Sequence, residues 1–390
     1  MNILVILPRF PYPLFKGDKL RAFHQIRMMS RNNNVYLICL NEEAVATEGL
    51  KLLQPYCTKI KTIRNTKLHS LLQLTKGLFS SKPFQAHFFA NSRLKKTVFE
   101  WCGKYNIDVL FAQMIRMGEN IPENIKAHKH LDFQDALSFN MKRRYHHSGK
   151  YYKKLVKEEQ KRLEVYEREI THKFDTFSAI SKPDIRILEK ITGKEIFLLP
   201  NGVNEEFFDF PLNEEKKYDL IFTGNMGYHP NITACKYLVN ELLPILSTEY
   251  RPLKICLAGT NPAPEIQAMQ SDLVTVTGRV PDLRPYLANA RLFIAPLFSG
   301  SGLQNKLLES MAMGLPSITT HLANNALKAK PGKDIIVCND RQAFTRQLIW
   351  LLENEKEARE IGINGRNFIK EKYRWETFDD QFNEFISSFL

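Results

Sequence analysis

Short apolar runs alternate with longer amphipathic stretches along most of the chain. In the first half the apolar runs predict strands, which lie at residues 3–7, 35–40, 59–63, 109–113, 130–133, 176–180 and 196–199. Between them the pattern predicts helices at residues 19–31, 44–53, 93–104 and 150–173. Short continuous apolar strands separated by helices are typical of βαβ units in a parallel sheet.

The turn signal Pro200-Asn201-Gly202 follows the last of these strands, and the alternation then starts again. Strands are predicted at residues 219–222, 254–258, 274–277, 292–295, 317–320 and 335–338, and helices at 232–246, 282–290, 303–312, 341–354 and 358–372. An amphipathic helix at 377–389 closes the chain. The pattern favours two tandem α/β domains, each a doubly wound Rossmann-like sheet.

The domain boundaries follow from this repeat. We expect an N-terminal acceptor-side domain at residues 1–200, with a C-terminal helix within 374–390 packing back on it, and a C-terminal nucleotide-sugar-binding domain at 201–373. Ligands of such sheets bind outside the carboxyl ends of the strands. Two sheets that face a cleft would therefore hold one substrate each.

Basic residues are concentrated in the first half of the chain. Residues 1–200 carry 35 Lys and Arg against 19 Asp and Glu, whereas residues 201–390 carry 20 against 23. This imbalance suggests an anionic partner for the first half, and nucleic acid, an anionic membrane surface or an anionic glycan would each fit. A basic surface without a partner fits equally well.

The cysteines and the lengths of the apolar runs indicate the cellular compartment of the protein. None of the six cysteines forms a C-x-x-C pair, which favours buried thiols in a reducing compartment over zinc ligands or disulfides. Residues 1–8 are apolar but lack a basic flank and a cleavage site, so they predict a first strand and not a signal peptide. No run approaches the roughly 18 apolar residues of a membrane span. We expect a cytoplasmic protein. Any contact with the cell membrane should be peripheral, at its inner face.

The loop at residues 296–304 carries the clearest chemistry. A predicted strand ends at Pro296, and a glycine-serine loop then opens a helix, where backbone amides can bind phosphate. Lys306 can place a positive charge on a diphosphate, and Glu309 lies on the same helical face, where a carboxylate suits ribose hydroxyls. The alternative is a structural glycine turn with Lys306 and Glu309 as an exposed ion pair.

Several segments together resemble one enzyme family. Residues 300–316, Gly332, Asp340 and residues 361–376 resemble the C-terminal domain of the GT-B retaining glycosyltransferases of family 4. The similarity continues at residues 199–203 and 222–226. Residues 16–21 resemble the subgroup that acts in bacterial exopolysaccharide and envelope glycan synthesis.

The resemblance implies a role for each matching position. It implies that Glu309 holds the nucleotide ribose and that Lys306 neutralises the leaving diphosphate. The predicted donor site further contains Gly17, Arg21, Gly224, Asn225, Arg279, Val280, Gly300, Ser301, Gly302, Leu303 and Gln304. Among these, Arg279 and Val280 would frame the base, and Gly17 would approach the diphosphate across the cleft.

The chain departs from the family pattern at three places. Ser301 stands where the family has its first glutamate, and residues 225–231 replace a basic pair expected after Gly224. Lys306, with Arg21 or Arg279, would then carry more of the phosphate charge. Asp135 lies near the family's active-site histidine, where it would orient the acceptor or stabilise charge at the anomeric carbon. A helix N-cap before residues 136–142 explains it equally well.

The sequence contains no Asp-x-Asp, the motif with which many transferases hold a divalent cation. We therefore predict transfer without a metal or other cofactor, from a UDP or GDP type of sugar donor to a glycan or lipid-linked acceptor, with retention implied by the resemblance. The alternatives are a GT-B sugar-nucleotide epimerase and a non-enzymatic basic module that binds polyanions.

Two basic stretches remain outside this site. Residues 142–157 interleave Lys and Arg with tyrosines, and no nucleic-acid motif accompanies them, which favours a solvated face or membrane contact. Residues 69–89 combine basic residues with leucines. They predict an acceptor-side or interfacial element, or ordinary core packing.

Overall fold

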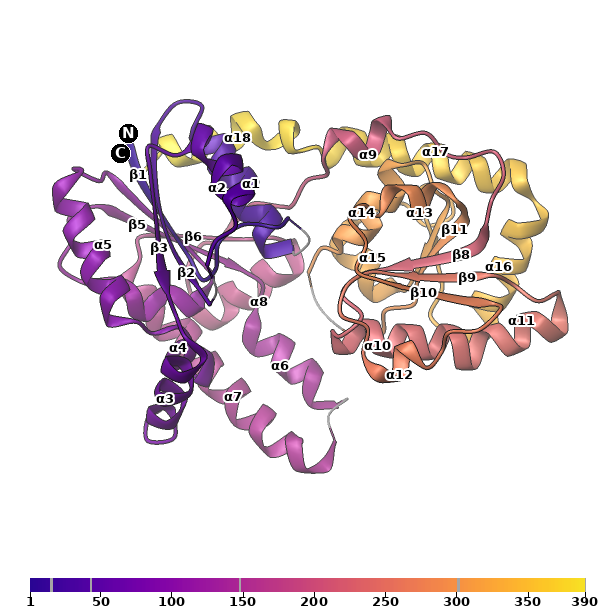
Figure 1. The fold of residues 1–390 in the computed structure, drawn as a ribbon, viewed down its shortest axis with the longest axis horizontal. Helices are drawn as coiled ribbons and strands as arrows, with labels where there is room; N and C mark the ends of the chain where they lie inside the picture. Colours follow the sequence, from indigo (N-terminus) through magenta and orange to yellow (C-terminus); the bar gives the residue numbers. More distant parts are fainter. Residues whose placement is uncertain (15–16, 43, 147–148, 300–301, 390) are drawn as a thin grey trace. The chain divides into compact units, whose positions relative to one another are not determined.

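The computed structural model describes residues 1–14, 17–42, 44–146, 149–299 and 302–389 (Figure 1). The chain divides into two compact units. Unit 1 consists of Met1–Pro200 together with Phe378–Leu390, and unit 2 consists of Asn201–Thr377. Each unit is an α/β layer structure built on one parallel sheet, so the predicted fold class is confirmed.

Unit 1 contains a seven-stranded sheet in the order β3-β2-β1-β4-β5-β6-β7. Its strands are β1 (Asn2–Leu7), β2 (Asn34–Asn41), β3 (Lys59–Arg64), β4 (Val109–Gln113), β5 (His128–Gln134), β6 (Thr176–Ala179) and β7 (Phe197–Leu198). Its helices are α1 (Gly17–Met29), α2 (Thr47–Leu53), α3 (Lys67–Gly77), α4 (Phe84–Phe89), α5 (Ser92–Lys104), α6 (Leu137–His146), α7 (Lys150–Glu169), α8 (Lys182–Thr192) and α18 (Asp379–Ser387). The strands β1 and β4 at the middle of the sheet are mostly apolar and buried because helices cover the sheet.

The C-terminal helix α18 belongs to unit 1. Phe382 and Ile386 are buried, and the ring of Phe382 lies 6.3 Å from that of Phe111 in β4. Phe385 stacks on Phe197 of β7 with ring centroids 4.0 Å apart. This aromatic contact explains why the amphipathic end of the chain packs against the first sheet, beside the N-terminus in Figure 1.

Unit 2 contains a six-stranded sheet in the order β10-β9-β8-β11-β12-β13. Its strands are β8 (Tyr218–Thr223), β9 (Ile255–Ala258), β10 (Val274–Gly278), β11 (Ala290–Ala295), β12 (Ser317–Thr319) and β13 (Ile336–Val337). Its helices are α9 (Glu205–Asp209), α10 (His229–Lys236), α11 (Leu243–Glu249), α12 (Pro264–Gln267), α13 (Arg284–Ala288), α14 (Asn305–Ala312), α15 (His321–Leu327), α16 (Arg341–Glu353) and α17 (Glu355–Lys372). The helix predicted at 232–246 is interrupted by a π-helical segment at Tyr237–Leu242.

In both units the strand order reverses at one point in the sheet. The reversal lies between β1 and β4 in unit 1 and between β8 and β11 in unit 2. The connections on the two sides of such a point leave in opposite directions, which opens a crevice at the carboxyl ends of the strands. The loops that follow β8 and β11, and those that follow β1, β4 and β5, are therefore the places to look for a site.

Candidate functional site

Helix α14 begins close to the carboxyl end of β11 in unit 2. The sequence predicts its start near Gly302, but the structure begins it at Asn305. Gly302 has a left-handed φ of 72°, and Gln304 is extended at the N-cap, so neither has helical geometry. The predicted helix start is therefore wrong by about a turn, and Lys306 lies in the first turn.

The ammonium group of Lys306 lies in a small polar and aromatic pocket. Its Nζ donates to Oδ1 of Asn231 at 2.5 Å and lies 4.4 Å from the centre of the Phe222 ring. Burial lowers the pKa of Lys306 to about 8, although Cys235 and Glu309 nearby act in the opposite direction. No described carboxylate lies within ion-pair distance of this ammonium, so the alternative of an exposed ion pair with Glu309 is wrong.

Two glycines keep this pocket narrow. Gly224, just after β8, has a φ of 153°, and a Cβ there would lie 3.0 Å from the Lys306 Nζ. Gly259, just after β9, has a φ of 151°, and its Cβ would lie 1.8 Å from the Gly224 carbonyl oxygen. A larger residue at Gly259 would displace backbone, and one at Gly224 would displace the side chains of Asn231 and Lys306. The side-chain amide of Asn231 donates to the Asn225 carbonyl at 2.8 Å and ties this loop to the lysine.

Glu309 lies three residues after Lys306 on α14 and is half-buried. Burial raises its pKa to about 7, and the charge of Lys306 offsets this only in part. No hydrogen bond from the described residues reaches its carboxylate. A half-buried carboxylate whose oxygens are not occupied by described hydrogen-bond donors can accept hydrogen bonds from a polyol such as ribose.

The N-terminus of α14 has no side-chain cap. The side-chain oxygen of Asn305 instead accepts from Nδ2 of Asn201 at 3.0 Å, and the Gln304 amide donates to the Gly302 carbonyl at 3.4 Å. By contrast, Thr320 caps α15 and Asp340 caps α16. Uncapped amides beside a lysine suit an anion.

The remaining predicted donor residues are placed unevenly. Leu303 is buried, Arg279 is exposed just after β10, and Val280 follows it. Gly17 is exposed at the first position of α1 in unit 1. Gly300 and Ser301 lie outside the described residues. Of the predicted donor residues, the structure brings together Gly224, Asn225 and Lys306. Three residues that were not predicted lie with them, namely Phe222, Asn231 and Gly259.

Arg21 occupies the interior of unit 1, with 1% of its surface exposed. Its Nε and Nη2 donate to the two carboxylate oxygens of Asp132 at 2.7 and 3.0 Å, and its Nη1 donates to the Leu199 carbonyl at 2.7 Å. Burial alone would raise the pKa of Asp132, but Arg21 and a hydrogen bond from Gln25 lower it. The guanidinium of Arg21 therefore has a structural role within unit 1. A sugar donor could bind it only while it also holds Asp132 and the Leu199 carbonyl.

Asp135 follows the last residue of β5 and is half-buried. It does not cap α6: Asp184 accepts from the Ala136 N–H at 3.2 Å, and Glu167 accepts from the Ser138 N–H at 2.9 Å. Burial raises the pKa of Asp135 to about 7, and the negative charge of Asp184 adds to the rise. The N-cap alternative is therefore wrong, and Asp135 remains available for chemistry near neutral pH.

Further polar groups lie near the ends of β1, β4 and β5. Arg9 pairs with Asp18 at 3.1 Å. Burial lowers the pKa of Arg116, while the charges of Asp18 and Asp135 oppose the change, and its buried Nε has no described hydrogen-bond partner. Positive φ values at Met114 and Gln134 mark strained backbone at the ends of β4 and β5, as at many functional sites. The sequence gives no sign of this strain.

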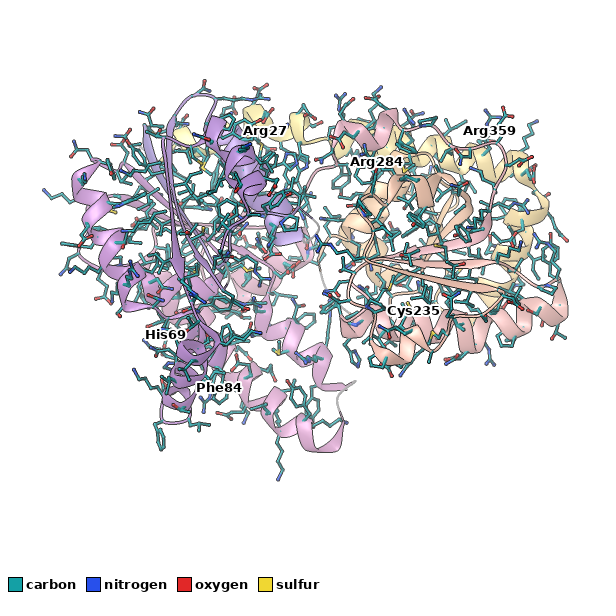
Figure 2. All side chains as sticks on the ribbon, viewed as in Figure 1. Arg27, His69, Phe84, Cys235, Arg284 and Arg359 are labelled. Carbon is teal, nitrogen blue, oxygen red and sulfur yellow. The ribbon has the colours of Figure 1, made fainter. Side chains whose placement is uncertain are left out.

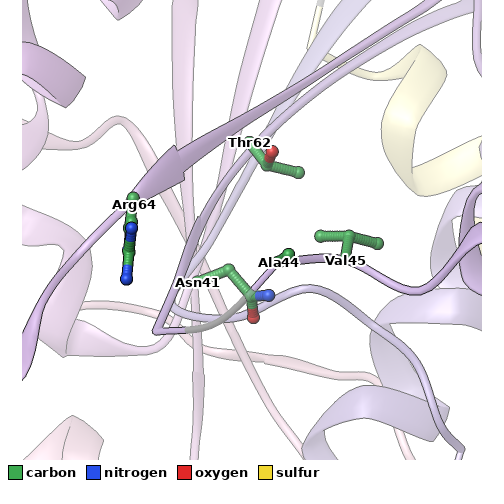
Figure 3. Close-up of a pocket in the computed structure, with 5 residues that line it drawn as sticks. All are labelled: Asn41, Ala44, Val45, Thr62 and Arg64. Carbon is green, nitrogen blue, oxygen red and sulfur yellow. The ribbon is translucent and has the colours of Figure 1, made fainter.

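A separate hollow lies at the carboxyl ends of β2 and β3 in unit 1 (Figure 3). It has a volume of about 240 Å³, and its lining residues are Asn41, Ala44, Val45, Thr62 and Arg64. None of these residues belongs to the predicted donor site.

Neither metal clusters nor membrane spans are found in the described part of the chain. No group of three or more His, Cys, Asp or Glu side chains there is arranged to hold a metal ion. None of the helices within those residues is both long and apolar enough to cross a bilayer.

Known proteins resemble this chain both in the sequence around the site and in the fold. Residues 217–354 match the family model described as glycosyl transferases group 1. An uncharacterized 44.6 kDa protein in the cps region of Klebsiella pneumoniae is 21% identical over 394 residues, which cover 95% of this chain and 96% of that protein. The capsular polysaccharide biosynthesis glycosyltransferase CapM of Staphylococcus aureus is 25% identical over 205 residues, 48% of this chain and 53% of CapM.

The solved structure of Anabaena Alr3699/HepE in complex with UDP has the same fold. It covers 100% of both chains with a TM-score of 0.71 at 11% identity. The group 1 match includes β8, α14 and Lys306, and thus the whole pocket around Gly224. Together these findings support a glycosyltransferase with the GT-B fold.

Proposed function

We propose that this protein binds a nucleoside-diphosphate sugar of the UDP or GDP type in unit 2 and transfers the sugar to a glycan or lipid-linked acceptor. We place it in family 4, with retention of configuration and no requirement for metal. Its place of action is the cytoplasm, at the inner face of the cell membrane. The names of CapM and of the Klebsiella protein favour a role in polysaccharide synthesis.

The observation that carries the proposal is the position of Lys306. A half-buried ammonium beside Gly224, in the first turn of an uncapped helix, offers charge and amides to one anion. The departing diphosphate is where negative charge develops during sugar transfer, so donors held there stabilise the transition state. In this proposal Glu309 accepts hydrogen bonds from the ribose, and Asp135 orients the acceptor.

Titration calorimetry in the presence of EDTA tests this function. UDP, GDP, ADP, CMP and their sugars are compared, and we expect one diphosphate nucleotide to bind without divalent cation. Binding that requires added Mg²⁺ would contradict the metal-free mechanism. Salt-sensitive binding to polyphosphate without affinity for any nucleotide would instead favour the polyanion-binding module.

The affinity for the sugar donor should depend on pH in a bell shape. Lys306 must be protonated to hold phosphate, so affinity should fall about tenfold per pH unit above its pKa of about 8. Glu309 must be ionised to accept from ribose, so affinity should also fall below its pKa of about 7. Calorimetry with UDP-glucose suits this test because its diphosphate is a diester and lacks the second phosphate pKa near about 6.

Glu309→Gln is the matched variant for this profile. It should weaken donor binding about tenfold and remove the acidic limb, while the basic limb remains, because only the carboxylate is lost. The variant Glu353→Gln, at an exposed carboxylate on α16 of the same unit, serves as the control. An acidic limb that persists in Glu309→Gln would assign it to another group.

Asp135→Asn should lower kcat about a hundredfold without changing donor affinity, because it removes a carboxylate and keeps its shape. The ionised form orients the acceptor hydroxyl, so the native kcat should rise with pH through the pKa of about 7. The variant should lose this rise. Steady-state transfer rates from about pH 6 to 9 at saturating donor measure both effects.

Glu167→Gln is a stringent control for this experiment. Burial also raises the pKa of Glu167 to about 7, but this carboxyl group caps α6 and is 0% exposed. Its variant should keep the pH dependence of kcat, because Glu167 is buried within unit 1 and a glutamine oxygen can still accept from the Ser138 N–H. If Glu167→Gln abolished the rise instead, Asp135 would not be the titrating group.

A further inference from the structure

Helix α3 of unit 1 turns its apolar residues toward solvent. The large apolar side chains on α3 and the two residues after it are among the most exposed in the described chain, namely Leu68 (67%), Leu71 (59%), Leu72 (56%), Leu78 (63%) and Phe79 (93%). We call these five residues the α3 patch. Core packing, one of the alternatives for this stretch, is therefore wrong for them. An ordinary surface helix exposes its polar face, so this orientation needs an explanation.

Polar contacts fix the opposite face of α3 on unit 1. Asn65 donates to the Ser70 hydroxyl at 3.0 Å, and Nε2 of His69 lies 3.1 Å from the Ala90 carbonyl oxygen. A Cβ at Gly77 would lie 3.0 Å from the Phe84 ring, so helices α3 and α4 meet closely there. Figure 2 labels His69 and Phe84 in this helix pair. The helix therefore cannot bury its leucines by rolling without losing these contacts.

The sequence that carries the patch is strongly basic, although Glu119 and Glu158 of neighbouring elements pair there with Lys82 and Arg162. Residues 49–99 contain ten Lys and Arg and no Asp or Glu, and residues 136–157 contain seven and none. Lys67 and Lys76 are exposed on α3 itself. Helices α6 and α7 carry the second stretch, and α7 is fixed to α3: Nη1 of Arg162 donates to the Gly77 carbonyl at 2.7 Å. Figure 1 shows α3 and the N-terminal half of α7 at the same end of unit 1.

We propose that the α3 patch inserts into the interface of an anionic lipid bilayer, with the surrounding lysines and arginines against the headgroup phosphates. At about 1.5 Å per residue, the 11 residues of α3 span roughly 16 Å, so the helix lies in the interface and does not cross it. Exposed leucine and phenylalanine side chains beside the exposed Lys67 and Lys76 match acyl chains beneath anionic headgroups. A protein partner would leave the absence of acidic residues over two long stretches unexplained.

Binding of the α3 patch to a bilayer would place the protein where the proposed lipid-linked acceptor is found. Its consequence for catalysis rests on the proposed function, whereas lipid binding itself does not. Docking by α3 would hold unit 1, which contains Asp135, at the surface where a lipid-linked acceptor is embedded. We therefore expect vesicles to lower the KM for such an acceptor and to leave the donor affinity unchanged.

Co-sedimentation of the full chain with vesicles tests the proposal. The protein should bind vesicles of phosphatidylglycerol mixed with phosphatidylcholine and bind pure phosphatidylcholine far more weakly. Phe79→Ser together with Leu71→Ser should weaken binding at least about tenfold, and Lys67→Gln with Lys76→Gln about fivefold per charge. Ile363→Ser in unit 2 is the matched control, because Ile363 is 50% exposed and lies outside the patch.

The outcomes separate this proposal from the enzyme assignment. Donor binding by calorimetry without vesicle binding would overturn the bilayer proposal and leave the transferase standing. Vesicle binding without nucleotide affinity would do the reverse. If the chain ignored lipid and sedimentation velocity showed a dimer that Phe79→Ser dissociates, the patch would be a contact between two copies and the bilayer proposal would be wrong.

Discussion

Lys306→Ala is expected to lower kcat by about a hundredfold to a thousandfold while the protein stays folded. The departing diphosphate would lose the ammonium of Lys306, and a donor of this kind acts mainly when charge develops in the transition state. KM for the donor should rise less than kcat falls. Transfer rates at saturating donor and acceptor measure the effect, with circular dichroism to verify the fold.

Lys306→Met separates the charge from the packing of the side chain. Its unbranched chain can still lie over Phe222, so the loss of turnover should match that of the alanine variant. The pKa of Lys306 is lowered to about 8 in the folded protein, so the unfolded chain holds this proton more tightly, and the charged lysine opposes folding at neutral pH. The methionine variant should therefore unfold at equal or higher urea concentration.

Lys333→Met provides the control for both variants because Lys333 is exposed in the same unit. It should change neither turnover nor the urea midpoint. A fully active Lys306→Met would remove the lysine from the diphosphate site. An inactive variant with a much lower midpoint would mean that the lysine is structural.

The fold was predictable because central strands in such sheets are apolar on both faces. The apolar runs at residues 3–7 and 109–113 coincide with β1 and β4. A short run of consecutive apolar residues is typical of a buried strand and not of a loop. Helix α3 was not predictable in the same way. Its leucines face solvent, and periodicity alone shows that a helix has an apolar face, not where that face points.

The site was predictable only where local sequence determines local geometry. The loop and helix around Lys306 are continuous in the chain, so their proximity follows from spacing. Asn231 is 75 residues away from Lys306, and only the sheet order of β8 and β11 brings it to the ammonium. The roles of Asp184 and Glu167 as caps of α6 are equally non-local, which is why Asp135 itself was a reasonable N-cap candidate.

Arg21 shows how one residue type can support two interpretations. An arginine four residues after the first glycine of α1 suits a phosphate as well as it suits a carboxylate. The deciding feature is Asp132, which is 111 residues away in sequence and 0% exposed in the structure. A buried bidentate pair requires its partner, since each unpaired charge would be strongly disfavoured in the interior.

Arg21→Met is accordingly expected to lower the free energy of unfolding by about 3–5 kcal/mol, because it leaves the Asp132 carboxylate buried without its cation. The pair also fixes the end of unit 1, through the hydrogen bond from Arg21 to the Leu199 carbonyl. Urea unfolding at neutral pH measures the loss. Lys96→Met, which removes a surface pair at 3.9 Å, should change stability by less than about 1 kcal/mol.

The double variant Arg21→Met with Asp132→Leu decides between structure and donor binding. Removing both charges should restore part of the stability that either single change loses, because no buried charge is then left unpaired. If Arg21 acts only in this pair, the double variant should bind the nucleotide sugar as the native protein does. A folded double variant with donor affinity reduced tenfold or more would return Arg21 to the diphosphate, where the sequence first placed it.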